Sequence, residues 1–201
     1  MIQLSDRLLS MEESATIAMS RKSRELKALG KDVISLSLGE PDFNTPDFIK
    51  DAAKEAMKNN FTKYMPVPGY EDLRESISKK FKRDNNLDYS KDQIVVSTGA
   101  KQSIANVVMT LINPGDEVII PAPYWVSYIE IVKVSGGIPV IVNAGIEQDF
   151  KITGDDLSKA ITSKTKLIIF STPCNPTGSV YSREELRSLA DTLKMNPNVI
   201  A

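Results

Sequence analysis

Residues 94–125 read IVVSTGAKQSIANVVMTLINPGDEVIIPAPYW, and this stretch decides the fold class. Residues 94–97 have the composition of a strand, residues 102–112 keep apolar side chains at helical spacing, and residues 117–120 again favour a strand. A strand, a helix and a second strand in this order are typical of a parallel sheet covered by helices. We therefore predict an α/β fold in which a ligand binds at the carboxyl ends of the strands.

The same alternation continues towards the carboxyl end of the sequence. In chain order, the predicted elements are a helix at 124–134, strands at 138–142 and 167–170 with a helix at 155–161 between them, a helix from a Ser182–Glu185 capping box to Lys194, and the start of a strand at 198–201. The predicted fold class is thus a mostly parallel sheet with helices on both faces. Because the sequence finishes inside an apparent strand, we expect it to be part of a longer protein.

The amino-terminal part alternates less regularly. Its predicted elements are a helix over 14–29 that stops at Gly30, a short half-buried strand with Ile34, Leu36 and Leu38 on one face, a helix that opens at Thr45-Pro46 and ends near Asn59-Asn60, and an amphipathic helix over 70–81. Taken alone, this part is compatible with almost any α/β protein.

Composition excludes several classes of partner. With 41% hydrophobic residues and a net charge of −1, the chain presents no broad positive field for a nucleic acid or an anionic membrane. No apolar stretch is long enough to span a bilayer, and Asp6 and Arg7 interrupt the apolar start, unlike a secretory signal. We expect a soluble, cytoplasmic protein with neither nucleic acid nor a membrane as its partner.

The chain has no histidine and one cysteine, Cys174. Histidine acid–base chemistry, an intramolecular disulfide and a metal site built on several thiolates are therefore excluded. Any reaction here must draw on lysine, carboxylates, tyrosine or a cofactor.

The turn Thr98-Gly99-Ala100-Lys101-Gln102 joins the first predicted strand to its helix. Small residues let the backbone approach an anion, and the amides of a helix's first turn favour a phosphate. The spacing is neither that of a P-loop nor that of a dinucleotide-binding turn. The turn is thus either a phosphate site or an ordinary strand-to-helix connection.

Two further loops follow predicted strands and so belong to the same edge of the sheet. Trp125, the only tryptophan, is either a core residue or a platform for a flat ligand. The loop 171–178, with sequence STPCNPTG, is stiffened by two prolines and is either a rigid ligand loop around Asn175 or a plain turn.

Together these segments resemble the class I aminotransferases that depend on pyridoxal 5'-phosphate, and bacterial aspartate aminotransferases in particular. The landmarks are, in order, residues 37–43, 63–64, 68–69, 97–102, 113–116, 123–128 and 175–178, which cover nearly the whole chain. The resemblance implies an amino-terminal arm and small-domain segment at 1–45 and an incomplete cofactor-binding large domain at 46–201.

The resemblance also implies a role for individual residues. Cofactor-binding roles fall on Gly99, Ala100 and Lys101 for the phosphate, on Trp125 for stacking on the pyridine ring, on Asn175 for the ring hydroxyl oxygen, and on Tyr64 for the phosphate of a neighbouring subunit's cofactor. Gly39, Trp125 and Asn175 would contact the amino acid substrate. Shared sites imply a homodimer. Without the resemblance, Tyr64 is simply an exposed aromatic, Lys101 a solvated helix residue and Gly39 a turn.

No catalytic residue is assigned within the chain. In the family the lysine that carries the cofactor covalently lies beyond the segment matched here, so Lys101 is not that lysine. We expect the parent protein to transfer an amino group from L-aspartate to 2-oxoglutarate, and this chain alone to be inactive. The alternatives are a prephenate, aromatic, alanine or kynurenine aminotransferase, and a non-catalytic pyridoxal-phosphate-binding module such as a regulator's sensor domain.

Overall fold

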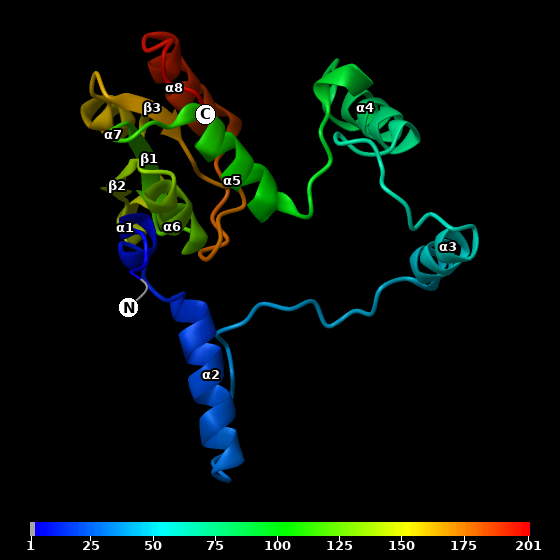
Figure 1. The fold of residues 1–201 in the computed structure, drawn as a ribbon. Helices are drawn as coiled ribbons and strands as arrows, with labels where there is room; N and C mark the ends of the chain where they lie inside the picture. Colours follow the sequence, from blue (N-terminus) through cyan, green and yellow to red (C-terminus); the bar gives the residue numbers. More distant parts are fainter. Residues whose placement is uncertain (1–2) are drawn as a thin grey trace. The chain divides into compact units, whose positions relative to one another are not determined.

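The computed structural model describes residues 3–201, with helices and strands labelled in Figure 1. The chain divides into two compact units. One comprises residues 104–201 together with the segment up to Ser37, and the other spans Leu38–Ser103. Within the described residues, every helix is too short or too polar to cross a lipid bilayer.

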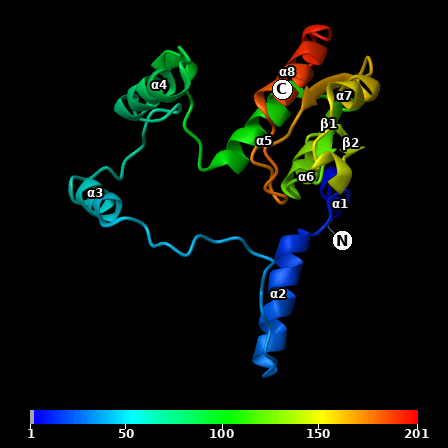
Figure 2. The same cartoon turned by 180° about the vertical axis from the view of Figure 1, so that it is seen from behind.

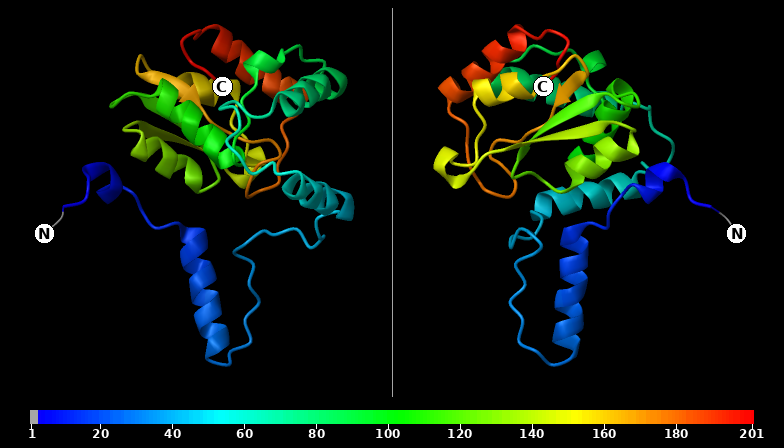
Figure 3. Two further views of the ribbon diagram at one scale, coloured as in Figure 1. Left: turned by 45° about the vertical axis from the view of Figure 1, so that its right-hand side comes forward. Right: turned by 90° about the vertical axis from the view of Figure 1, so that its left-hand side faces the viewer.

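A parallel three-stranded sheet forms the centre of the first unit. Its strands are β1 (Glu117–Ala122), β2 (Ile138–Asn143) and β3 (Thr165–Ile168), in the order β2-β1-β3. Both neighbours run parallel to β1, as can be followed in Figure 3, and β2 forms one edge, visible from behind in Figure 2. The predicted α/β fold with a parallel sheet is confirmed.

Helices cover both faces of this sheet. Val118 and Ile120 of β1 belong to a core cluster with residues of α5 (Ala100–Leu111) and α6 (Ser127–Val134). Ile119, between them in sequence, belongs to a second cluster with residues of α7 (Gly154–Ala160) and α8 (Arg183–Lys194). Successive side chains of a strand point to opposite faces, so the apolar run of β1 fills both clusters.

The remaining helical elements are α1 (Asp6–Leu9), α2 (Ala15–Ala28), α3 (Asp47–Lys58), α4 (Glu71–Asn85) and the 3₁₀ turns η1 (Lys91–Gln93) and η2 (Ile146–Gln148). Of these, α2, α3 and α4 agree with the helices predicted from sequence, whereas α1 and the two 3₁₀ turns were not predicted. Gly30, at φ +77°, ends α2 as predicted, because its amide and that of Lys31 bond back to the carbonyls of Lys27 and Leu26.

The capping box predicted for α8 is confirmed. The Glu185 amide donates to Ser182 Oγ at 3.2 Å, and the Ser182 amide donates to Glu185 Oε2 at 2.6 Å. α6 begins at Ser127 rather than at the predicted Tyr124, because residues 123–126 form the turn that leaves β1.

The prediction of a strand around Ile34, Leu36 and Leu38 is wrong. No strand is assigned there, and the three side chains are 84%, 89% and 58% exposed. Alternation alone does not make a strand, since the backbone groups need a neighbouring chain to pair with.

The strand predicted at 94–97 also does not form a ladder. Its Ile94 is buried, but apart from short-range bonds to Lys91 and Gly99 its backbone is bonded to a distant segment through the Val96 amide, which donates to the Pro68 carbonyl at 3.0 Å. At the other end, the start of a strand predicted at 198–201 is reduced to one parallel bridge between Ile200 and Leu167.

We predict that Ile119→Ala lowers the free energy of unfolding by about 2–5 kcal/mol, the cost of a cavity in a packed core. Ile119 is fully buried between β1 and the helices of the second cluster. Ile146→Ala, the same change at a side chain that is 78% exposed, is the matched control and should cost less than about 0.5 kcal/mol. Urea unfolding followed by circular dichroism measures both, and equal losses would contradict this account of the core.

Candidate functional site

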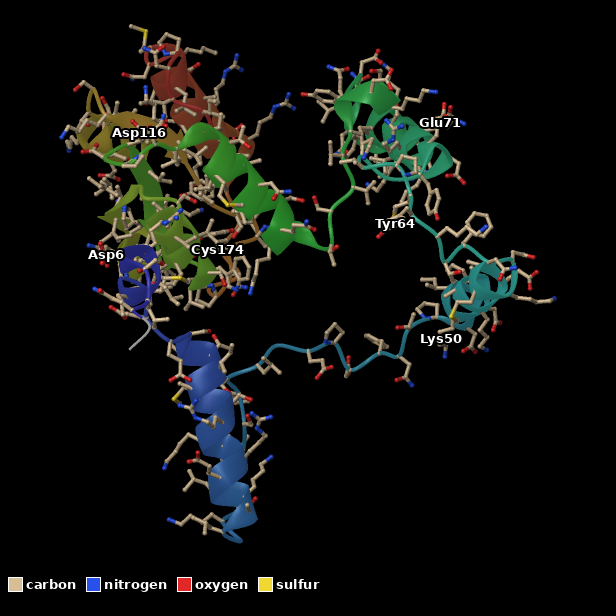
Figure 4. The ribbon with its side chains drawn as sticks, viewed as in Figure 1. Asp6, Lys50, Tyr64, Glu71, Asp116 and Cys174 are labelled. Atoms are coloured by element: carbon tan, nitrogen blue, oxygen red, sulfur yellow. The ribbon has the colours of Figure 1, made fainter. Side chains whose placement is uncertain are left out.

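The loops after β1 and β3 leave the sheet at the same edge, because the two strands are adjacent and parallel. The first loop carries Trp125 and the second carries Asn175. A hydrogen bond joins them directly: the Cys174 thiol donates to the Pro123 carbonyl at 3.4 Å. Cys174 is labelled in Figure 4. The structure thus brings two of the predicted site residues onto neighbouring loops.

Trp125 is half-buried and has a fixed aromatic neighbour. Its ring meets that of Tyr128 edge-on, with centroids 5.5 Å apart and an interplanar angle of 90°. The Tyr128 amide donates to the Trp125 carbonyl at 3.0 Å, and the indole packs against the cluster that contains buried Tyr128. The core reading made from sequence therefore applies in part, since Trp125 packs against the core cluster without being fully covered by it, and the reading as a platform for a flat ligand stays a prediction.

Asn175 is exposed and lies in a tight turn. The Gly178 amide donates to the Cys174 carbonyl at 2.8 Å, and the Cys174 amide donates to the Ser179 carbonyl at 2.9 Å. The Asn175 amide itself donates to Ser171 Oγ at 3.3 Å. These backbone bonds define a tight turn in which Asn175 is exposed.

The segment that follows Asn175 is fastened to the chain after η2. Tyr181 is buried, and its hydroxyl accepts a hydrogen bond from the Ile152 amide at 2.9 Å. Lys151 Nζ donates to the Val180 carbonyl at 3.3 Å, and it lies 2.8 Å from a carboxylate oxygen of Glu185. Burial raises the pKa of the Tyr181 hydroxyl above its ordinary value.

The Gly99 turn belongs to the second unit. Gly99 adopts φ +86°, and the adjacent helix α5 begins at Ala100 and continues through Lys101. The Thr98 amide donates to the Gln102 side chain at 2.5 Å, which closes the turn against the first turn of the helix. An added Cβ at Gly99 would meet no atom within 4 Å, so glycine is required here by backbone conformation and not by space.

The other two predicted residues also lie in the second unit. Tyr64 is fully exposed on the extended connection between α3 and α4, where Figure 4 labels it. Gly39 is exposed, with nothing within 4 Å of an added Cβ.

Sequence reasoning missed Lys151 and Tyr181, whose contacts join the segment after Asn175 to the chain after η2. A signal for Tyr181 was present: it directly precedes the N-cap residue Ser182, the position from which an apolar side chain packs against the fourth helical residue, here Leu186. Tyr181 belongs to the second core cluster, and Leu186 packs against that cluster. Nothing local in the sequence identifies Val180 and Glu185 as partners of Lys151.

Comparison with known proteins gives consistent matches along the chain. Residues 31–201 match the family model described as aminotransferase class I and II. A probable aspartate/prephenate aminotransferase of Rhizobium leguminosarum bv. phaseoli is 55% identical over 196 residues, which cover 98% of this chain and 49% of that protein. The aspartate/prephenate aminotransferase of Nitrosomonas europaea is 50% identical over 199 residues, covering 99% of this chain and 50% of the relative.

Solved structures agree with these matches. The aspartate aminotransferase from Rhizobium meliloti has a TM-score of 0.95 at 40% identity, covering 99% of this chain and 50% of that chain. The aspartate aminotransferase from Thermus thermophilus with maleate has a TM-score of 0.94 at 40% identity, covering 100% and 52%. The chain spans about half the length of the curated relatives it matches.

We predict that Gly99→Ala lowers the free energy of unfolding by about 1–2 kcal/mol, because a Cβ disfavours the left-handed backbone that this turn adopts. Gly39→Ala is the matched control: it adds the same methyl group in equally open space, at a residue without a positive φ. Its effect should stay within about 0.5 kcal/mol. Urea unfolding of both variants checks the difference, and an unaffected Gly99→Ala variant would argue against a strained turn.

The Lys151–Glu185 pair predicts a pH dependence. Hydrogen bonding to Lys151 lowers the pKa of Glu185 below its ordinary 4.5, and hydrogen bonding to Glu185 raises the pKa of Lys151 above its ordinary 10.5. The pair's stabilisation is therefore complete between these two ordinary values. It is lost as the pH falls through the lowered pKa of Glu185, and also as the pH rises through the raised pKa of Lys151.

We accordingly predict that Lys151→Met has a lower Tm than the unmodified chain at neutral pH, and that this difference shrinks as the pH is taken below 4.5. Lys164→Met, at an exposed lysine in the turn before β3, is the control and should change Tm little at any pH. Thermal denaturation across the acidic range measures both. A Lys151→Met difference that does not vary with pH would mean that the ion pair is not its source.

Proposed function

Because the chain belongs to the aminotransferase class I and II family, we propose that the protein it forms part of transfers an amino group from L-aspartate to 2-oxoglutarate, using pyridoxal 5'-phosphate. The observation that carries the proposal is the match along 98% of this chain to relatives named aspartate/prephenate aminotransferases. The arrangement of Trp125 and Asn175 on adjacent loops at the carboxyl edge of a parallel sheet supports it, since this edge is where such folds bind ligands.

The residues of the Gly99 turn fit the phosphate of this cofactor. An α-helix leaves its first amides without acceptors inside the helix, and its dipole favours an anion at that end. Here α5 starts at Ala100, beside a glycine with open space next to its Cα. Gly99, Ala100 and Lys101 would hold the phosphate, with Lys101 adding a positive charge.

Trp125 and Asn175 would hold the ring of the cofactor. The Trp125 indole, steadied edge-on by Tyr128, offers a flat apolar face for stacking. The exposed Asn175 side chain offers an amide N–H to the ring hydroxyl oxygen and helps to orient the substrate carboxylate. When bound, the cofactor supplies an electron sink for the α-carbon of the amino acid.

Gly39 and Tyr64 are proposed to complete the site. Gly39 would close over the substrate carboxylate, where a side chain would obstruct it. Fully exposed Tyr64 would reach the cofactor phosphate of a second subunit, which makes the active protein a homodimer with shared sites. In the same proposal, residues 1–45 form an arm and small-domain segment, residues 46–201 form part of the large domain, and the protein is cytoplasmic.

Prephenate is a second candidate acceptor of the amino group. The names of the relatives from Rhizobium leguminosarum and Nitrosomonas europaea join it to aspartate. Both acceptors carry a carboxylate next to the keto group, so Asn175 would orient either one in the same way. Aspartate remains the proposed amino donor in both cases.

The experiment compares the 201-residue chain with the complete translation product of its gene. With pyridoxal phosphate and L-aspartate, we predict that the complete product aminates 2-oxoglutarate and prephenate, whereas the 201-residue chain gives no measurable transfer. The reason is that, in this proposal, the lysine that carries the cofactor covalently lies outside these 201 residues.

Borohydride reduction and intact mass separate the outcomes. The 201-residue chain, of 22.2 kDa, should show no stoichiometric reduced adduct on a specific lysine. One adduct mapped to Lys101 or another lysine here would contradict the proposal for this chain. A complete product that binds the cofactor but does not accept aspartate would contradict the proposed donor.

A further inference from the structure

We propose that Tyr181 and Lys151 are positioning residues, which hold the loop of Asn175 in the orientation its ligand requires. The proposal rests on the proposed role of Asn175. The loop leaves β3, turns at Cys174–Ser179 and enters α8, with no helix or strand of its own between Ile169 and Ser182. Its orientation must therefore come from contacts with the rest of the unit.

Tyr181 closes the loop at its base. Its ring lies against that of Phe170, where the loop begins, with centroids 5.6 Å apart and an interplanar angle of 67°. Its amide donates to Thr172 Oγ1 at 3.0 Å. One residue at the end of the loop thus contacts two residues at its start, which brings the two ends of the loop together.

Three successive residues of the loop are bonded to the chain after η2. Ser179 Oγ donates to Asp149 Oδ1 at 3.4 Å and Lys151 Nζ donates to the Val180 carbonyl at 3.3 Å. The Ile152 amide donates to the Tyr181 hydroxyl at 2.9 Å. We call the contacts of residues 149–152 with 179–185 the clamp.

Charge reinforces the clamp. The Lys151 side chain is only 14% exposed and contacts carboxylate oxygens of Asp149 and Glu185 at 3.1 and 2.8 Å. Glu185 also accepts the Ser182 amide, so the same carboxylate caps α8 and pairs with Lys151. The end of the loop is therefore fixed to both the helix that follows and the segment that packs beside it.

The backbone is strained in the segment 149–152, which forms one side of the clamp. Asp149 and Phe150 adopt φ values of +52° and +57°, in the left-handed region that side chains disfavour. Two such residues in succession persist only where surrounding contacts outweigh the strain, and such strain concentrates at segments with a functional constraint. Here the left-handed pair lies between the η2 turn and Lys151, whose neighbours make the contacts described above.

Cys174 supplies a reporter of loop position, because it is the only cysteine and directly precedes Asn175. We predict that Tyr181→Phe, which keeps the ring but leaves the Ile152 amide without its acceptor, increases the rate of Cys174 alkylation by iodoacetamide about tenfold under native conditions. Lys151→Met should act in the same direction. The cofactor is left out of this measurement, so its outcome does not depend on the proposed function.

Val118→Ala is the matched control. Val118 is fully buried at the start of β1, in the other core cluster, so the change lowers global stability without touching the clamp. For each variant, the alkylation rate is plotted against the free energy of unfolding, measured in urea. If Tyr181→Phe and Val118→Ala fall on one line of rate against stability, Tyr181 has a merely structural role and the proposal is overturned.

A second readout tests the link to the ligand. In the complete translation product, Tyr181→Phe should weaken pyridoxal phosphate binding several-fold, whereas Val118→Ala should leave the dissociation constant unchanged. Faster alkylation with unchanged binding would overturn the positioning role. A complete product that fails to use aspartate, with both clamp results as expected, would instead contradict the proposed function and leave the positioning role supported.

Discussion

The parallel pairing of β1 with β3 is the constraint on which the candidate site depends. Parallel neighbours end at the same edge, so the segments that leave these two strands emerge side by side. The Cys174 thiol reaches the Pro123 carbonyl across that edge. Residues 50 positions apart in sequence, Trp125 and Asn175, are thereby placed on one surface, and antiparallel pairing would have sent the two loops to opposite ends of the sheet.

The two halves of this surface are held in different ways. Trp125 lies on a turn that continues at once into α6, and it gains its position from packing beside Tyr128 and the core cluster beneath it. Asn175 has no such support, because its loop is exposed and irregular. Hydrogen bonds and charge add to the packing of the Tyr181 ring against Phe170 there, through Tyr181 and Lys151. Apolar burial places the first loop, whereas the second is held by polar contacts together with the ring of Tyr181.

Sequence patterns predicted the sheet, the helices on both faces and the capping box of α8, because periodicity and capping residues act locally. They failed at Ile34–Leu38, which alternates, and at 94–97, which has the composition of a strand, because no neighbouring strand pairs with either segment. The roles of the predicted site residues came from a family resemblance, whereas the Gly99 turn, Trp125 and the loop of Asn175 were already candidates from their own chemistry and position. The contacts of Lys151 with Val180 and Glu185 could not be predicted, since these partners lie 29 and 34 residues away.

The contacts of Lys151 also restrict how the sequence can diverge. One ammonium group serves a backbone carbonyl and two carboxylates, so replacing it with an uncharged residue leaves Asp149 and Glu185 facing each other without their shared counter-charge. Evolutionary change at position 151 is thus tied to change at 149 and 185. Among diverged homologues, the residues at these three positions should therefore vary together. That covariation would show that the orientation of the loop depends on all three residues and not on any one of them.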